Sequence, residues 1–392
     1  MPSMSLTTLS TWTPSPYAYL ALHLALILTS LVIKPSPYRQ WFFVLLLLLS
    51  WRLVMDGQAG YLTSTVWSMS LLMASDYVLL TDVQRELILL PEVDVSRSRR
   101  MASNRRRIKI ENAPLAQRVR WAMNLFLNPR GVGWAHEPRA ALPSRPPPTT
   151  PRTTFLTREL AHLLLALIVF DLANLHARWS PAFRLRTGLA AVGLPWRVLG
   201  TLAWAAGAAA ALSLVHSTAS IVCVVLRVSR PRDWPPLFGS LADMRSVRTF
   251  WARGWHQLLR RSLSAHGNYL AHTVLRLPPK STLSYAVKIL TAFALSGLAH
   301  YLSETVAVRP GRSGSLLFFS LQPAAIALEM LVAWCAPSAG HWALGHLWVF
   351  AWFALTLPIM QDPLIQAGEL ASRVEVSLIM GLCRGTWVLP PV

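Results

Sequence analysis

The chain has 392 residues, of which 53% are hydrophobic and 14% are charged, whereas a soluble domain usually carries about 25% charged residues. This composition excludes an ordinary soluble globular protein and predicts an all-α, polytopic membrane protein. The formal net charge of +20 would suggest a nucleic-acid partner in a soluble protein. Because the basic residues lie between apolar runs and no recognition motif accompanies them, we expect them to contact membrane lipids instead, and we expect no nucleic-acid binding.

Apolar runs of nearly membrane-spanning length recur along the chain. A transmembrane helix needs about 20 apolar residues, so the pattern predicts about eight spans. The candidates are residues 17–33, 41–55, 61–80, 155–175, 198–228, 283–302, 315–335 and 343–360, with 376–389 as a weaker one. The run 198–228 is long for one straight span, and it forms either one tilted helix or a broken pair.

A long polar region separates the third and fourth expected spans. Six arginines and one lysine lie within residues 97–109, and a segment rich in Pro and Thr covers 142–154. By the positive-inside rule this region is cytosolic, while the amphipathic segment 115–127 can lie in the membrane interface. We therefore expect three parts: N-terminal membrane helices at 1–80, a basic cytosolic loop with its linker at 81–154, and a second membrane domain at 155–392.

The stretch 233–263 has a different composition from the apolar runs on both sides of it. It begins with the proline-rich turn DWPP, and it carries His256 among Trp251, Arg253, Trp255 and Gln257. Such a cluster can orient a thioester carbonyl and stabilise the oxyanion that develops on it, and the arginines near it can meet the phosphates of coenzyme A (CoA). Composition alone favours a simpler alternative, an amphipathic interfacial helix with lipid-facing arginines.

His300 lies inside the apolar segment TAFALSGLAHY. An ionisable residue at such a position is energetically costly and therefore a candidate for function. Ser296 and Glu304 lie one helical turn before and after it, where each can bond to the ring. A neutral imidazole there can accept a proton from an alcohol. From the helix alone, a core histidine bonded to a backbone carbonyl explains the pattern equally well.

The cysteines and the remaining histidines predict no metal site. The three cysteines, Cys223, Cys335 and Cys383, lie far apart and form no CxxC pair. His341 and His346 are five residues apart with no carboxylate beside them. We expect neither a bound metal nor a disulfide framework.

Several segments, in this order, resemble the wax-synthase-like branch of the membrane-bound O-acyltransferases, as found in fungi. They are NPRGVGW at 128–134, DWPPLFGSL with RTFWARGWHQLLR at 233–260, SGLAH at 296–300, LQPAAIALE at 321–329, and LGHLWVFAWFALTLPIMQDP at 344–363. A single such segment would be a weak match, whereas the ordered set is specific.

The resemblance implies a site as well as a fold. The family's membrane-embedded catalytic histidine corresponds to His300, and its second polar position, an Asn in the sterol-acyltransferase branch, corresponds to His256. The expected substrate-binding residues are Trp251, Arg253, Trp255, Gln257 and Ser296. The helices are expected to surround a tunnel that acyl-CoA enters from the cytosol. No bound cofactor is expected, and the resemblance leaves the oligomeric state open.

The function implied is an acyl-CoA-dependent O-acyltransferase. Fungal relatives of this kind often transfer acetyl from acetyl-CoA to a hydroxyl of a terpenoid or meroterpenoid secondary metabolite, in a multi-pass protein that we expect in the endoplasmic reticulum. One alternative is a wax-ester synthase that joins a long-chain acyl group to a fatty alcohol, and another is a non-enzymatic membrane transporter. A membrane terpene cyclase is weaker, because it requires an acid deep in a span.

Overall fold

The computed structural model of the chain describes residues 15–56, 59–90, 110–308, 313–335, 342–369 and 375–389. Over these ranges the chain forms helices, turns and two isolated β-bridges, but no strand. The expected all-α class is confirmed. The basic segment 97–109 and His341 lie outside the described residues.

Six helices in the described ranges are long and apolar enough to cross a membrane, which confirms the polytopic architecture. The first is a continuous helix of 20 residues formed by η1 (Pro37–Gln40) and α2 (Trp41–Asp56). The others are α6 (Arg152–Trp179), α8 (Leu194–Val225), α11 (Thr282–Ala307), α12 (Ser315–Cys335) and α13 (Trp342–Gln366). The sequence suggested about eight spans. The difference arises because α1 (Pro16–Val32) has 17 residues and α3 (Tyr61–Ser75) has 15.

Three sequence expectations have clear outcomes. The long run 198–228 is one helix, α8, of 32 residues, and not a broken pair. The amphipathic segment is α5 (Leu115–Leu127), with the bounds expected. The weak span candidate 376–389 was wrong, because it contains only α14 (Leu378–Arg384), whose 7 residues are too few to cross a bilayer.

Short helices and π-helical turns complete the chain. The short helices are α4 (Val83–Glu86), α7 (Pro181–Arg184), α9 (Val247–Thr249) and α10 (Arg260–Asn268). The π-helical turns are η2 (Asp76–Leu80), η6 (Phe250–Gly254) and η7 (Tyr269–Val274). Such turns are rare and are frequent at functional sites. Here η2 contacts α10, while η6 and η7 precede and follow it in the chain.

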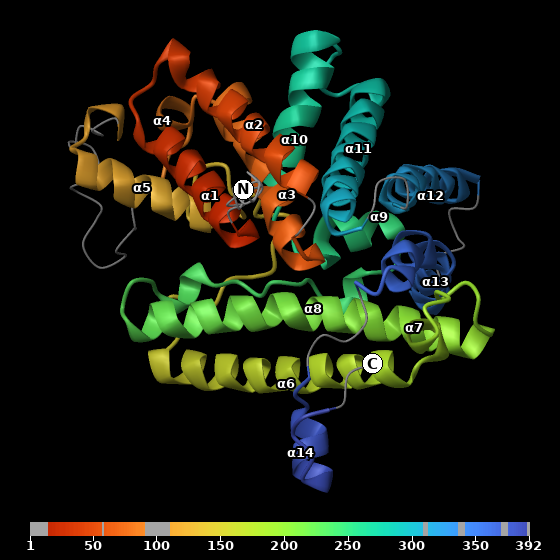
Figure 1. Cartoon of the computed structure of the whole chain (residues 1–392). Coiled ribbons are helices and arrows are strands. Elements are labelled where there is room, and N and C mark those ends of the chain that lie inside the picture. The colour runs from red at the N-terminus through yellow and green to blue at the C-terminus, as the bar shows by residue number, and fades with distance from the viewer. Residues whose placement is uncertain are drawn as a thin grey trace, which may run out of the picture.

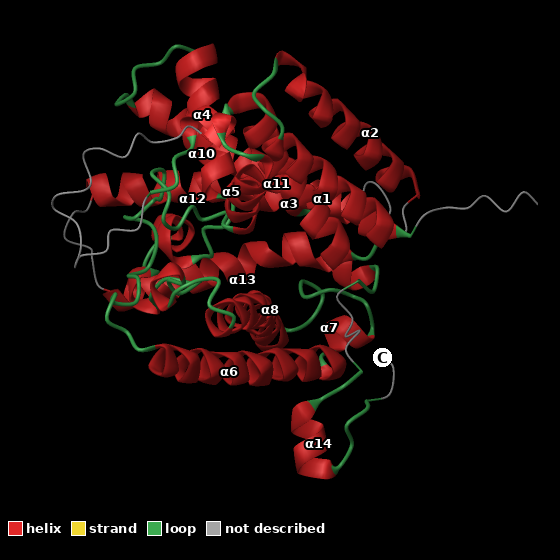
Figure 2. Cartoon of the chain, turned by 90° about the vertical axis from the view of Figure 1, so that its left-hand side faces the viewer, coloured by secondary structure: helices red, strands yellow, loops and turns green. Residues whose placement is uncertain are grey.

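The helices form two groups, which Figure 1 shows one above the other. In the lower group α6 and α8 run side by side along most of their length. In the upper group α11 packs against α3, α10 and α12. Figure 2 shows α8 between α6 and α13, with α14 projecting away beneath α6. The N-terminal helices therefore pack directly on the helix that carries His300.

Small residues allow the closest helix contacts, as is usual in membrane proteins. A side chain at Gly297 would place its Cβ 3.2 Å from Phe319 Cβ, so the glycine lets α12 approach α11. At Gly314, just before α12, a Cβ would lie only 1.7 Å from the carbonyl oxygen of Ile359 in α13. Gly297 lies one turn before His300 on α11, so the close approach of α12 at this glycine helps to position the candidate site.

The C-terminal end of α1 is capped by side chains from elsewhere in the chain. The last carbonyls of a helix have no partner within it. Gln84 donates its amide to the carbonyls of Leu31 and Ile33, at 2.7 Å each, and Arg118 donates to the carbonyl of Val32 at 2.8 Å. These bonds attach α4 and α5 to the N-terminal helices and leave few buried backbone groups unpaired.

We predict that Gly314→Ala lowers the stability of the protein. The new methyl group cannot fit beside the Ile359 carbonyl without a backbone shift, and such overpacking typically costs about 1–3 kcal/mol or more. Thermal unfolding of the detergent-purified protein measures the effect. Gly193→Ala is the matched control, because its Cβ would meet only Pro195 Cδ at 3.9 Å. Equal unfolding temperatures for the two variants would contradict the packing described.

Candidate active site

His300 lies on α11 with its ring stacked on Phe319 of α12. The ring centroids are 5.0 Å apart and the planes differ by 15°. The residue is partly exposed, yet its Nδ1 is buried and has no hydrogen-bond partner among the described residues. A core histidine held through Nδ1 by a backbone carbonyl is therefore not what the structure shows. The packing on Phe319 fixes the ring, and Nδ1 has no partner within the described structure.

The polar residues one turn away from His300 bond elsewhere. The hydroxyl of Ser296 donates to the carbonyl of Ala292 at 2.8 Å, and the carboxylate of Glu304 accepts from the hydroxyls of Ser313 and Ser315. The spacing of Glu304 had suggested that it orients the His300 ring, but its carboxylate bonds to these two serines instead. Glu304 thereby fixes the start of α12, the helix that carries Phe319.

His256 lies in the turn between η6 and α10. Its Nδ1 accepts a hydrogen bond from the backbone N–H of Leu258 at 3.3 Å. A neutral imidazole that accepts at Nδ1 carries its proton on Nε2. Burial lowers the pKa of His256 to about 4, so the ring is neutral at neutral pH. The side chain therefore presents an Nε2–H donor.

Gln257 holds this turn in an uncommon backbone conformation. Its φ is +35°, in the left-handed region that non-glycine residues rarely adopt. The side-chain amide donates to the carbonyls of Trp251 at 2.9 Å and Trp255 at 2.6 Å, and its oxygen accepts from Arg260 at 2.8 Å. A strained position held by several bonds often marks a functional site. Three hydrogen bonds of the Gln257 side chain are thus formed within the turn itself. Its expected contact with substrate remains a prediction.

A chain of aromatic rings connects the two histidines. Trp255 contacts His256 with centroids 5.4 Å apart, and Phe319 is the ring stacked on His300. Consecutive centroids are 5.1 to 5.9 Å apart along the series Trp255, Phe250, Trp251 and Phe319. The two imidazoles are close enough to interact electrostatically. The structure therefore brings His256, Trp255, Trp251 and His300 together.

Of the other expected residues, Arg253 is exposed and Ser296 is partly buried on α11. Arg253 lies in η6, the turn that leads to His256. The expected contacts of Arg253 and Ser296 with substrate remain predictions.

Gln322 anchors Trp251 from the middle of α12. Its side chain is fully buried, and its oxygen accepts from the indole N–H groups of Trp251 and Trp352, at 3.2 Å each. Its amide donates to the carbonyl of Phe318 at 2.8 Å. Gln322 was not predicted as a functional residue from the sequence, although a polar amide in an apolar helix is a signal comparable to that of His300.

Glu329 attaches the start of the loop helix α9 to α12. One carboxylate oxygen accepts from the backbone N–H of Val247 at 2.5 Å and from the indole of Trp348 at 2.7 Å. A carboxylate at the N-terminus of a helix is favourable because unpaired N–H groups point toward it. Gln322 and Glu329, the two polar residues inside the segment LQPAAIALE, thus hold the loop that leads to His256.

Arg130 connects the segment NPRGVGW to the DWPP turn. Its guanidinium donates to the carbonyls of Pro235 and Pro236, at 2.8 Å each. Burial lowers the pKa of Arg130 to about 10, so it remains charged at neutral pH. The positive charge of Arg130 also helps to lower the pKa of His256, after the larger effect of burial. Two segments far apart in sequence therefore meet beside the candidate site.

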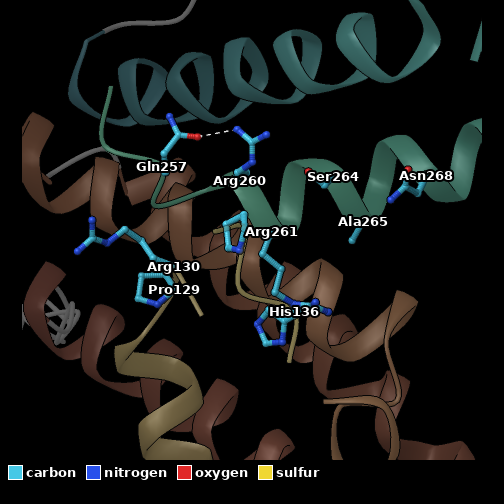
Figure 3. A pocket seen from close by; sticks show the side chains of 10 residues that line it. Pro129, Arg130, His136, Gln257, Arg260, Arg261, Ser264, Ala265 and Asn268 are labelled. Carbon is cyan, nitrogen blue, oxygen red and sulfur yellow. Dashed lines mark hydrogen bonds between the residues drawn. The ribbon is translucent and has the colours of Figure 1, made fainter. Parts of the chain in front are cut away.

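A cavity of about 170 Å³, lined by polar and charged residues together with two prolines and an alanine, lies next to the His256 turn. Figure 3 shows Gln257 and Arg260 above, Pro129 and Arg130 at the left, and the Arg261 side chain reaching from α10 down to His136. In the described part of the chain, no group of three or more His, Cys, Asp or Glu side chains could hold a metal ion.

We predict that Gln322→Leu destabilises the protein, because two partly buried indole N–H groups would lose their acceptor. An unpaired buried donor costs about 1–3 kcal/mol. Thermal unfolding in detergent provides the measurement. Thr356→Val is the control, since the Thr356 hydroxyl bonds only to the Trp352 carbonyl of its own helix turn. A Gln322→Leu protein as stable as the control would refute the anchoring role.

Comparison with known proteins identifies similar sequences over nearly the whole chain. The sequence model of the Membrane bound O-acyl transferase family matches residues 234–321, a range that contains both histidines. Acetyltransferase ple2 of Rhodocybe pseudopiperita is 34% identical over 95% of this chain and 97% of its own length. Acetyltransferase eriL of Hericium erinaceus is 36% identical over 70% of this chain and 74% of its own. Acetyltransferase pyr8 of Aspergillus fumigatus is 30% identical over 69% of this chain and 70% of its own length. No solved structure matches the chain.

Proposed function

The chain belongs to the membrane-bound O-acyl transferase family and is an O-acyltransferase, and from this premise we propose that it transfers acetyl from acetyl-CoA to a lipophilic alcohol. The proposed acceptor is a hydroxyl of a terpenoid or meroterpenoid secondary metabolite. Acetyl is supported by the names of the similar fungal proteins, each called an acetyltransferase. We propose the endoplasmic reticulum as the location of this integral, multi-pass protein.

The observation that carries the proposal is the pairing of two unlike histidines. His256 has a fixed N–H donor and is neutral. His300 has a buried nitrogen without a partner among the described residues. The aromatic rings between them provide an apolar wall, which strengthens electrostatic interactions by limiting water.

In the proposed reaction, His300 is the general base. The alcohol gives its proton to an imidazole nitrogen while its oxygen attacks the thioester carbonyl carbon. A carbon–oxygen bond forms, and the carbonyl π-electrons move onto oxygen. The Nε2–H of His256 donates to this oxyanion, which stabilises the tetrahedral state as it develops.

Collapse of the tetrahedral state completes the transfer. The oxyanion re-forms the carbonyl, the carbon–sulfur bond breaks, and the CoA thiolate leaves. The thiolate takes the proton from protonated His300, which restores the neutral ring. No acyl-enzyme is required. Holding both substrates in one site contributes orientation to the rate.

We expect His300→Ala to lower turnover by about 10²–10⁴-fold, the usual contribution of a general base. Acetyl transfer in microsomes, normalised to the amount of protein, measures the effect. His162→Ala is the control, because its side chain is 46% exposed and lies on a different helix, α6. A His300→Ala enzyme with turnover near that of wild type would remove the assigned base.

Substitutions of His256 should rank by their ability to donate a hydrogen bond. Asn retains an N–H donor, so we expect His256→Asn to lose about tenfold in turnover, whereas His256→Leu should lose about 10²–10³-fold. Since the pKa of His256 is lowered to about 4 by burial, its ring is neutral from pH 6 to pH 8, and its protonation should not change the rate in this range. The rate profile of His256→Asn between pH 6 and 8 should therefore parallel wild type. Equal losses for the Asn and Leu variants would exclude the donor role.

The donor and acceptor can be tested directly. Membranes containing the protein are incubated with labelled acetyl-CoA or palmitoyl-CoA and a panel of terpenoid and fatty alcohols. We expect acetyl esters of terpenoid alcohols. Palmitoyl esters of fatty alcohols would identify a wax-ester synthase instead, and the absence of any transfer would leave the transporter alternative.

A further inference from the structure

The cavity beside the His256 turn contains polar groups that the proposed reaction does not use. It is formed between the segment that follows α5 and the helix α10, and its volume is about 170 Å³. Pockets that enclose a whole drug-sized molecule measure roughly 300–1,000 Å³. The cavity is therefore suited to one charged group of a larger ligand.

The cavity has an excess of positive charge. Arg130 donates to two backbone carbonyls, and Arg260 donates to the carbonyl of Ala252 and to the oxygen of Gln257. Of the three arginines that line the cavity, only Arg261 contacts a carboxylate of the described residues, with its Nε 3.3 Å from Asp76 Oδ2. A guanidinium has five N–H donors, so Arg130 and Arg260 each keep donors for an anion.

The nearby carboxylate of Glu137 does not cancel this excess. Both of its oxygens accept from Arg145, and Oε1 is 2.9 Å from the Arg145 Nε. Glu137 therefore forms its own ion pair. The cavity retains a net attraction for anions, and guanidinium groups pair especially well with phosphate.

His136 gives the cavity a further donor that has no other role in the described structure. Both of its ring nitrogens are buried without a hydrogen-bond partner among the described residues. Leaving such groups unpaired is costly, so they imply a ligand or water. Figure 3 shows the His136 ring beside Arg261. Its position also requires Gly131, whose φ is +65° and whose Cβ would lie 2.7 Å from His136 Nε2.

We propose that this cavity binds a phosphate group of the acyl-CoA donor, with His136 and Arg261 as hydrogen-bond donors and with Arg130 and Arg260 adding positive charge at its wall. The inference rests on the proposed function, because it takes acyl-CoA as the substrate. Gln257 lines the cavity and directly follows His256. A phosphate bound here thus lies next to the turn that holds the thioester. Because the phosphate does not react, its binding mainly increases donor affinity.

A matched pair of substitutions on α10 tests the cavity without removing an existing contact. Ala265 lines it. Ala265→Asp and Ala265→Asn have nearly the same shape and differ in charge. We expect Ala265→Asp to weaken binding of labelled CoA about tenfold or more through charge repulsion, while Ala265→Asn stays within about threefold of wild type. The measurement is equilibrium binding to the full-length protein in nanodiscs of neutral lipid.

His136→Leu is the second variant, because it removes a ring that makes no described hydrogen bond. We expect about tenfold weaker CoA binding, whereas competition by pantetheine, which has no phosphate, should be unchanged in both His136→Leu and Ala265→Asp. Arg384→Gln on the distant α14 is the control. Equal weakening for CoA and pantetheine, or no weakening for either, would overturn the proposal.

An anionic lipid headgroup presents the same phosphate chemistry, so the binding assay is repeated in nanodiscs containing phosphatidylserine. If Ala265→Asp and His136→Leu change only the stabilisation of the protein by this lipid, and not CoA affinity, the cavity is a lipid site and the proposal is wrong. Failure of wild-type protein to bind CoA in either nanodisc would instead refute the donor in the proposed function.

Discussion

The hydrogen bonds from Arg130 to Pro235 and Pro236 join two parts of the chain that are more than 100 residues apart. Consecutive prolines lack N–H groups, so their turn offers acceptors without donors. When such a turn is covered by protein, its carbonyls need partners. A guanidinium can satisfy two adjacent carbonyls at once because its donors form a rigid fork. The guanidinium of Arg130, which makes these bonds, thereby brings a positive charge close to His256.

The loop is also held from the membrane helices. Glu329 binds the start of α9, and Gln322 binds the indole of Trp251. Both lie on α12, the helix that also carries Phe319 against His300. A polar segment outside the apolar spans is therefore positioned by polar side chains within one of them. This arrangement explains why a segment that resembles an interfacial linker in composition can keep a defined conformation.

Hydropathy and motif order predicted much of this structure. The bounds of α5 and α12 match the amphipathic and apolar patterns. The ordered motifs also led us to expect His256 and His300 in one site, and the assignment of this site remains a prediction. The left-handed backbone at Gln257 and the π-helical turn η6 were not predicted. Both depend on bonds between particular atoms in the folded chain, which hydrophobic periodicity does not encode. His136 was missed for a similar reason, since its burial beside Arg261 arises from packing between distant segments.

The two histidines need different backbones for the roles proposed. A general base needs a nitrogen that no neighbouring donor occupies, and within a helix the backbone N–H groups are already bonded to carbonyls four residues earlier. His300 on α11 meets that condition. An oxyanion donor needs a fixed tautomer. His256 obtains it from the N–H of Leu258 two residues later, a group that would be unavailable if the helix continued. The interruption of helical structure between η6 and α10 is therefore what allows the second histidine to act as a donor.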